Sequence, residues 1–265
     1  MQLTINHKTS YSYDMPVDFA LQKLRLRPLT NTMQHVDDWQ IDVTGGQIEA
    51  SYQDHYGNHT DLVSVTPGAT TVAFTAHGKV TTHDKAGVLG PVYGRAPLWH
   101  FAQSTFLTAP GAGVRDMARA LGKMKDPVTS LHDLSNAIRD ALPYQTGVTG
   151  ADTTAEQAIK IGGGVCQDHA QIFISALRTR GVPARYVSGY LMINDVIDQE
   201  AAHAWAEAHI EGLGWVGFDI SNGVSPDEKY VRVAIGRDAT CAAPVKGMRM
   251  GPSNETLIVS LQVQQ

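Results

Sequence analysis

The chain has 265 residues, of which 43% are hydrophobic and 18% charged, and this composition indicates an ordinary globular protein with one large domain or two modest ones. Its formal net charge of −5 gives no reason to expect nucleic acid or an anionic membrane surface as a partner. No apolar run approaches the roughly 20 residues that a membrane-spanning helix requires.

The N-terminal residues MQLTINHKTSYSYD alternate polar and apolar side chains and lack the basic-then-apolar layout of a signal peptide. The two cysteines, Cys166 and Cys241, are too few for a disulfide framework, and reduced thiols fit them better. We therefore expect a cytoplasmic protein that has no membrane partner.

Residues 1–85 predict β-structure. Short strand-like runs are separated by turn clusters such as TGG and YGN, at the even spacing of a β-sandwich. Residues 86–97, AGVLGPVYGRAP, are rich in glycine and proline and predict a linker. The strand-like runs are LTINHKTSYSY, LQKLRLRPL, WQIDV, IEASYQD and TTVAFTAHGKV.

Residues 98–265 predict an α+β domain in which helices precede a sheet. The helical patterns are GVRDMARALGK, DPVTSLHDLSNAIRDAL, TTAEQAIKI and the segment after Cys166. The second is expected to start near Asp126-Pro127, and Thr153 or Thr154 is expected to cap the third. The strand-like runs are ARYVSGYLMI, HAWAEAHI, WVGFDI, YVRVAIG and TLIVSLQVQ.

Cys166 follows three glycines and stands where a helix should begin. A helix N-terminus favours the thiolate that nucleophilic chemistry needs, and Asp168 in the first turn favours the helix start. The glycines are expected to let a substrate approach the backbone. Residues at helical spacing from Cys166 place the sulfur on the buried face: Ala170, Phe173, Ile174 and Leu177.

The same segment is equally compatible with a small buried core cysteine, because most free cysteines are core residues. Cys241, in GRDATCAAPVKG, has no comparable setting, and we expect it to be structural.

A thiol nucleophile needs a base that a third group orients. His203 opens the run HAWAEAHI and Asp219 follows WVGF, so a hairpin packed on the Cys166 helix could bring the three groups together. His203 would take the thiol proton, and Asp219 would hold the imidazole.

The register of this hairpin tests the hypothesis. A four-residue loop, Glu211 to Gly214, would pair Ala206 with Asp219 and put His203 and Asp219 on opposite faces. A triad requires a three- or five-residue loop, or a bulge. We therefore predict that Asp219 lies opposite Trp205 or His203.

Other chemistries fit the sequence less well. His203, Glu207 and His209 share a strand face, but the first and last lie about 20 Å apart, too far for one metal ion. Neither HExxH nor a phosphate-binding glycine motif occurs, so we expect no metal and no cofactor. Tyr144 is a candidate oxyanion donor beside the Cys166 backbone N–H, with a structural role for its hydroxyl as the alternative.

Several segments together resemble the bacterial transglutaminase-like proteins, which are often described as cysteine proteases. They are GGGVCQDHAQIFISALRTRGVPARYVSGYL, HAWAEAHIEGLGWVGFDISNG and YVRVAIGRD in the core, and INHKTSYSYDMPV, LRLRP, Gln34 and DHYGN in the first 85 residues. The resemblance covers nearly the whole chain. It implies an α+β, papain-like or transglutaminase-like core of helices packed on an antiparallel sheet, preceded by a β-sandwich domain. It also implies that Cys166, His203 and Asp219 match the catalytic triad of the family.

The chain departs from the family at His169, where an aromatic residue is usual, and at Gln171, where histidine is frequent. Our hypothesis is that His169, close to the nucleophile, alters the polarity of the cleft or the choice of substrate. Gln167 and Trp205 are further candidates for lining or shaping the cleft.

The resemblance implies a cysteine-dependent acyl-transfer enzyme that forms a thioester from an amide, isopeptide or peptide bond. We expect water to resolve the thioester, because water is always present whereas a specific amine site must be built. The alternatives are a transglutaminase that transfers the acyl group to an amine, and a catalytically silent scaffold whose β domain binds a partner. The expected substrate is a peptide, a protein or a small amide; the sequence leaves its identity and the oligomeric state open.

Overall fold

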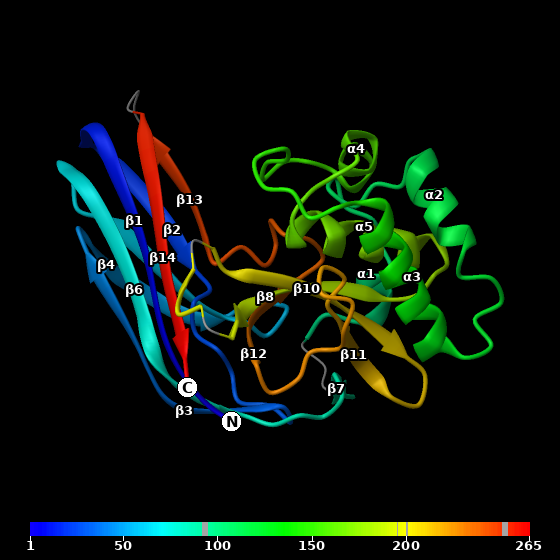
Figure 1. Cartoon of the computed structure of the whole chain (residues 1–265). Helices are drawn as coiled ribbons and strands as arrows, with labels where there is room; N and C mark the ends of the chain where they lie inside the picture. The colour runs from blue at the N-terminus through cyan, green and yellow to red at the C-terminus, as the bar shows by residue number, and fades with distance from the viewer. Residues whose placement is uncertain (92–94, 195, 200, 251–253) are drawn as a thin grey trace.

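The computed structural model describes residues 1–91, 95–194, 196–199, 201–250 and 254–265. Figure 1 shows a β-sandwich at one end of the molecule, a second antiparallel sheet beside it, and the helices on the far side of that sheet. The predicted α+β class, with a β-sandwich ahead of a helix-covered antiparallel sheet, is confirmed. In the described part of the chain, no helix combines the length and apolarity needed to cross a membrane.

The β-sandwich consists of two sheets with strand orders β3-β6-β1-β14-β9 and β13-β2-β5-β4. Every second side chain of β1 faces the interior over most of the strand, as the alternation in its sequence predicts. Tyr11, Phe74 and Val63 are among the residues buried between the sheets. The strands are β1 (Gln2–Val17), β2 (Phe19–Leu24), β3 (Gln34–Thr44), β4 (Gly46–Gln53), β5 (His59–Val65), β6 (Ala69–Thr82), β9 (Asp198–Gln199), β13 (Val245–Met250) and β14 (Glu255–Gln264).

The last two strands belong to the sandwich, which differs from the predicted division into residues 1–85 and 98–265. β14 pairs antiparallel with β1, and β13 pairs with β2. Figure 1 shows the red C-terminal strand lying beside the blue N-terminal one. The physical reason is that β1 and β2 would otherwise expose unpaired edges, which the end of the chain covers.

The sheet beside the sandwich, which we call the core sheet, has the strand order β12-β8-β10-β11-β7, and all its pairs are antiparallel. Its most buried helix neighbour is α5, which packs on β10 and β8 and is itself surrounded by α2, α3 and α4. The elements are β7 (Val88–Gly90), β8 (Ala184–Leu191), β10 (His203–Ile210), β11 (Gly214–Phe218), β12 (Tyr230–Gly236), α1 (Leu98–Phe101), α2 (Ala112–Arg119), α3 (Pro127–Ala141), α4 (Ala155–Ile161) and α5 (Cys166–Thr179).

Two helix starts follow the predicted signals. The Asp126 carboxylate accepts the Thr129 backbone N–H at the head of α3, with Pro127 in its first turn. Thr154, the later of the two proposed residues, caps α4: its hydroxyl accepts the Gln157 backbone N–H, and the Gln157 side-chain oxygen accepts the Thr154 backbone N–H.

The predicted linker is partly ordered into the core sheet. Within residues 86–97, β7 pairs with β11 through Trp215 and Val216. Residues 92–94 of the predicted linker lie outside the described residues.

Candidate active site

Cys166 is the first residue of α5, and N–H groups at a helix start have no carbonyl partner one turn earlier in the helix. In this first turn the Asp168 N–H is nevertheless engaged, because it donates to the Val165 carbonyl oxygen at 2.9 Å. The Asp168 carboxylate accepts the Val165 backbone N–H at 2.9 Å and the Thr149 hydroxyl at 2.6 Å, and this fixes the turn that presents the thiol. Cys166 itself is half-buried against the core. The prediction that Cys166 lies at a helix start, on the buried side of the helix, is therefore confirmed.

Gly164 has an internal role in the turn before α5. A Cβ atom at this position would lie 2.6 Å from the Asp168 Oδ2 oxygen, so the capping carboxylate leaves no room for a side chain. At Gly164 the close approach is made by Asp168, and access of a substrate to the backbone at the glycines stays a prediction.

The β10–β11 hairpin adopts the register that the triad hypothesis requires. Its loop has three residues, Glu211 to Leu213, so that Gly214 pairs with Ile210 and Phe218 pairs with Ala206. Gly214 has a φ of 80°, a left-handed conformation that favours glycine. Asp219 is therefore not paired with Ala206; it is the next residue after the ladder and falls level with Trp205 if the register is continued.

His203 lies between the other two groups of the predicted triad. Its Nε2 atom is 2.6 Å from Asp219 Oδ2, and its side chain also hydrogen-bonds the Cys166 thiol. Because Asp219 occupies Nε2, the nitrogen available to Cys166 is Nδ1. The three residues come from a helix start, a strand start and the end of a hairpin, as predicted.

Asp219 is fully buried and is held by more donors than the sequence indicated. The Tyr230 hydroxyl donates to Oδ2 at 2.7 Å, and the Asn222 side-chain amide donates to the same oxygen at 2.7 Å. The Asn222 backbone N–H donates to Oδ1 at 3.2 Å. Asn222 could have been anticipated as an Asp-initiated turn three residues on, whereas Tyr230 reaches the site only through the pairing of β12 with β8.

These contacts set the charges of the pair. Burial alone would lower the pKa of His203, but hydrogen bonds to Asp219 and Cys166, together with their negative charges, raise that pKa to about 10. Burial alone would raise the pKa of Asp219, but its hydrogen bonds and the charge of His203 lower it. At neutral pH His203 is therefore a positively charged imidazolium beside the Cys166 side chain.

A cleft of two adjoining pockets surrounds these residues. The pocket that contains Cys166 has a volume of about 590 Å³, and its neighbour has a volume of about 740 Å³. Tyr144 and His203 line both pockets, so the cleft passes on either side of them. Its size is in the range of small-molecule and peptide sites.

Two of the predicted cleft candidates line this cleft. Gln167 lines the pocket that contains Cys166, and Tyr144 lies at the boundary of both pockets. Burial raises the pKa of Tyr144, and the charges of Cys166 and Asp219 raise it further. Its hydroxyl is therefore protonated at neutral pH, which an oxyanion donor requires.

His169 and Trp205 are not exposed to the cleft. His169 is only 1% exposed; its Nδ1 lies 2.8 Å from the Ser221 hydroxyl and its Nε2 lies 2.9 Å from the Leu142 carbonyl oxygen. Trp205 is 2% exposed and packs behind His203 and Tyr230. The prediction that His169 and Trp205 line the cleft is corrected, because both side chains are buried and the His169 ring is hydrogen-bonded on both sides.

Cys241 has the structural setting that the sequence suggested. It is packed against the core cluster that contains Phe101 and Trp215, and its backbone N–H donates to Asp238 Oδ1 at 2.8 Å. Burial and the neighbouring Asp238 charge raise the pKa of its thiol. The two cysteines therefore differ in environment, which makes Cys241 an internal reference for the reactivity of Cys166.

Two family matches cover most of the chain. Residues 3–81 match the bacterial transglutaminase-like N-terminal region, and residues 115–220 match the transglutaminase-like superfamily. The second match contains all three residues of the predicted triad.

Relatives of similar length occur in mycobacteria. A protein of Mycobacterium leprae, named only as uncharacterized, is 27% identical over 281 residues, which is 99% of this chain and 98% of the relative. A similarly named protein of Mycobacterium tuberculosis is 27% identical over 291 residues, covering 98% and 91% of the two chains.

A crystal structure with the same architecture comes from Cytophaga hutchinsonii and bears the name "putative cysteine protease". It superposes with a TM-score of 0.76 at 22% sequence identity, covering 100% of this chain and 98% of that one. The similarity extends over both the β-sandwich and the helix-covered sheet, so the two proteins share the complete fold.

Proposed function

We propose that this chain, which belongs to the transglutaminase-like superfamily and carries the N-terminal region of its bacterial members, is a cysteine-dependent hydrolase of amide or peptide bonds. Cys166 is the nucleophile of this proposal, His203 the general acid and base, and Asp219 the residue that orients His203.

One observation carries the proposal: His203 hydrogen-bonds Asp219 at 2.6 Å and also contacts the Cys166 thiol. Thiol acyl chemistry needs a thiol nucleophile, an imidazole that exchanges protons with it, and a carboxylate that orients the imidazole. These three groups lie here in a hydrogen-bonded row. A structural cysteine would not require a buried aspartate held by Asn222 and Tyr230.

In the first step of this mechanism, the Cys166 thiolate attacks the carbonyl carbon of the scissile amide. A C–S bond forms, and the carbonyl electron pair moves to the oxygen. The Cys166 backbone N–H at the start of α5, with the Tyr144 hydroxyl as a candidate second donor, stabilises that oxyanion. When the intermediate collapses, the C–N bond breaks and His203 gives its Nδ1 proton to the leaving nitrogen.

In the second step, neutral His203 accepts a proton from water as the water oxygen attacks the thioester carbon. The C–S bond breaks, the carboxylic acid leaves, and the thiolate–imidazolium pair is restored. Asp219 keeps the imidazole oriented and stabilises its positive form in both steps.

Water, rather than an amine, is the proposed acceptor. The cleft continues on both sides of His203, and 13% of the His203 side chain remains exposed to solvent. Access of this kind supports hydrolysis of the thioester, since nothing needs to recognise the acceptor.

The test combines two assays on a glutamine-containing peptide. Hydrolysis predicts release of ammonia with no incorporation of dansylcadaverine, and Cys166→Ala abolishes the release. Incorporation of the amine at a rate comparable with ammonia release would instead establish a transglutaminase. Failure to release ammonia from glutamine peptides directs the assay to peptide bonds, where a mixed peptide library with mass-spectrometric detection is the substrate.

Cys241→Ala is the matched control for these assays. The Cys241 side chain lies in another core cluster, so its removal is expected to leave product formation intact. Equal activity in Cys166→Ala and the unmodified chain would contradict the proposal, whatever the substrate.

A further inference from the structure

A second cavity lies at the junction between the β-sandwich and the core sheet and shares no lining residue with the cleft around Cys166. We call it the junction pocket. Its volume is about 350 Å³. The sandwich side contributes Gln53 and Asn58, and the core side contributes Arg185 of β8 and Arg232 of β12. Arg95, ahead of α1, completes the wall.

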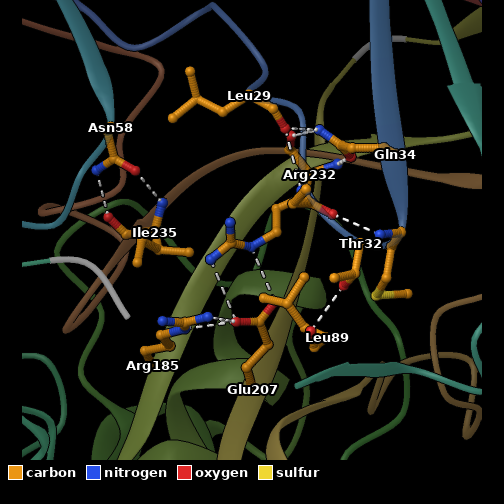
Figure 2. A network of polar contacts seen from close by, with 11 residues as sticks. Leu29, Thr32, Gln34, Asn58, Leu89, Arg185, Glu207, Arg232 and Ile235 are labelled. Atoms are coloured by element: carbon orange, nitrogen blue, oxygen red, sulfur yellow. Dashed lines mark hydrogen bonds and ion pairs between the residues drawn. The ribbon is translucent and has the colours of Figure 1, made fainter. Parts of the chain in front are cut away.

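The described wall of the junction pocket contains three arginines and no acidic residue. The compensating charge is Glu207, which lies behind the wall and contacts both core arginines, at 2.5 Å from Arg185 and 3.0 Å from Arg232. Figure 2 shows the two guanidinium groups converging on this carboxylate. One carboxylate against three guanidinium groups leaves an excess of positive charge at the pocket.

Glu207 does not use all the donors of its two partners. It contacts Nε and Nη2 of Arg185, and Nε and Nη2 of Arg232. A guanidinium has five N–H donors in a planar fork, and the buried Nη2 group of Arg185 makes no hydrogen bond although it lies close to Glu207. The fork of Arg185 therefore has donor capacity for another acceptor.

Arg185 is fixed in place although it is charged and buried. Its side chain is 1% exposed, and its Cζ atom lies 3.8 Å from the centre of the Trp215 ring. Burial lowers the pKa of Arg185 to about 9, despite the opposing effect of Glu207, and this still leaves it charged at neutral pH. A rigid, desolvated cation of this kind loses little conformational entropy when it binds an anion.

Two side-chain amides beside the pocket, those of Asn58 and Gln34, are already engaged. The Asn58 side chain accepts the Ile235 backbone N–H and donates to the Ile235 carbonyl oxygen, both at 2.8 Å. Gln34 makes the same pair of contacts with the backbone of Arg232, again at 2.8 Å. Figure 2 shows these two amides holding β12 on either side of the Arg232 side chain. The arginines, rather than these two amides, therefore have capacity for a ligand.

We propose that the junction pocket binds a small molecule through a phosphate or carboxylate group held by Arg95, Arg185 and Arg232. Guanidinium forks match these oxyanions in shape and charge and bind them by paired hydrogen bonds. The volume accommodates a compact metabolite-sized anion, and the walls come from both parts of the chain, so the ligand bridges them. This binding site does not depend on the function proposed for Cys166.

The test uses the intact chain and two probes, inorganic phosphate and glutarate, with potassium chloride at matched ionic strength as the reference. Isothermal titration and thermal unfolding are measured for each probe. The proposal predicts saturable binding of at least one probe and a rise in the unfolding midpoint beyond that caused by chloride. Comparison of the two probes distinguishes a phosphate from a carboxylate ligand.

Arg95→Gln is the main variant because this side chain is exposed and its replacement leaves the buried arginines in place. It is expected to weaken binding by about tenfold, since it removes one charge-assisted contact. Arg119→Gln, an equally exposed change on α2, is expected to bind as the unmodified chain does.

Arg232→Lys keeps the charge and loses the fork, and it is expected to weaken binding by a similar factor in a folded protein. The proposal is overturned if neither probe binds saturably, or if Arg95→Gln and Arg232→Lys bind as tightly as the unmodified chain.

Discussion

Tyr230 and His169 show that, at the scale of single residues, closeness in the sequence does not tell which side chains contact the catalytic groups. Tyr230 is 11 positions after Asp219 and donates to its carboxylate, whereas His169 is three positions after Cys166 and is buried, with its ring hydrogen-bonded to Ser221 and to the Leu142 carbonyl oxygen. The sequence indicated Cys166, His203 and Asp219 because their residue types define the chemistry. It could not indicate which buried polar groups support them, since that depends on how distant elements pack.

Tyr230→Phe tests the support of Asp219. The change removes one donor to a buried carboxylate, and we expect a loss of about 1.5–3 kcal/mol in the free energy of unfolding at neutral pH. Because the native pKa of Asp219 is lowered, its contribution to stability is present above the unfolded pKa and is lost as pH falls through the native pKa. Without Tyr230 the native pKa rises, so acid unfolding should begin at higher pH, as measured by far-UV circular dichroism.

Tyr52→Phe is the control, because Tyr52 is an exposed tyrosine of β4. It should unfold in acid as the unmodified chain does. An identical acid midpoint in Tyr230→Phe and Tyr52→Phe would show that the hydroxyl of Tyr230 does not stabilise the Asp219 carboxylate.

His169→Phe separates a structural role from the role in substrate choice first predicted for this residue. It restores an aromatic ring but leaves the buried Leu142 carbonyl without its donor, and we expect a loss of about 1–3 kcal/mol in unfolding free energy. The alkylation rate of Cys166 should not change. His83→Phe, at an exposed position, is the control for stability. A changed substrate preference at unchanged stability would contradict the structural role and support a role of His169 in substrate choice.

At the scale of elements, α5 and the β10–β11 hairpin bring the site together. The sequence predicted both, because the helical spacing after Cys166 and the two runs around EGLG are strong local signals. It left the loop length open, since glycine at 212, 214 or 217 could each have shifted the register. The structure selects the three-residue loop, and this choice places Asp219 within reach of His203.

Gly164→Ala tests how the start of α5 is built. The added Cβ would meet the Asp168 carboxylate at 2.6 Å, and overpacking of this kind typically costs about 1–3 kcal/mol. Gly150→Ala is the matched control, because a Cβ there meets nothing within 4 Å. Thermal unfolding should show a lowered midpoint only for Gly164→Ala. Equal midpoints for the two variants would mean that the Asp168 carboxylate can move away from the added Cβ without a loss of stability.

Strands with weak local patterns escaped prediction at this scale. β5 was not among the strands predicted, and β13, with the sequence VKGMRM, has mostly exposed side chains and no clear alternation. Both acquire their strand conformation from partners, β2 and β4 for β5 and β2 for β13. Pairing of this kind is a tertiary effect that local composition does not encode.

At the scale of the whole molecule, the last strand of the chain pairs with the first. The pairing of β14 with β1 joins segments about 250 residues apart, from Thr4 with Gln264 to Tyr13 with Glu255. The sequence suggested two consecutive domains because runs of strands and helices alternate in blocks. Composition does not predict that the last strands pair with the first sheet. The physical reason for that pairing is the edge of β1, which would otherwise be unpaired.

Removal of residues 255–265 tests this closure. The deletion takes away Leu261 and Val263, which are almost fully buried, and exposes the edge of β1. Burial of each side chain is worth about 1.5–3 kcal/mol, so we expect a lower unfolding midpoint and association through the open edge. Size-exclusion chromatography and thermal unfolding measure both, with removal of Gln265 alone as the control. A truncated chain that stays monomeric with an unchanged midpoint would contradict the role of β14.

The reactivity of Cys166 tests the central claim most directly. Native protein is treated with iodoacetamide over a range of pH, and alkylation of the two cysteines is followed by peptide mass spectrometry in the unmodified chain, His203→Ala and Asp219→Asn. An imidazolium-paired thiolate predicts that Cys166 reacts at least about tenfold faster than Cys241 at neutral pH, and that His203→Ala removes most of this advantage. If Cys166 reacts no faster than Cys241, or if His203→Ala leaves its rate unchanged, the catalytic account of this chain is contradicted.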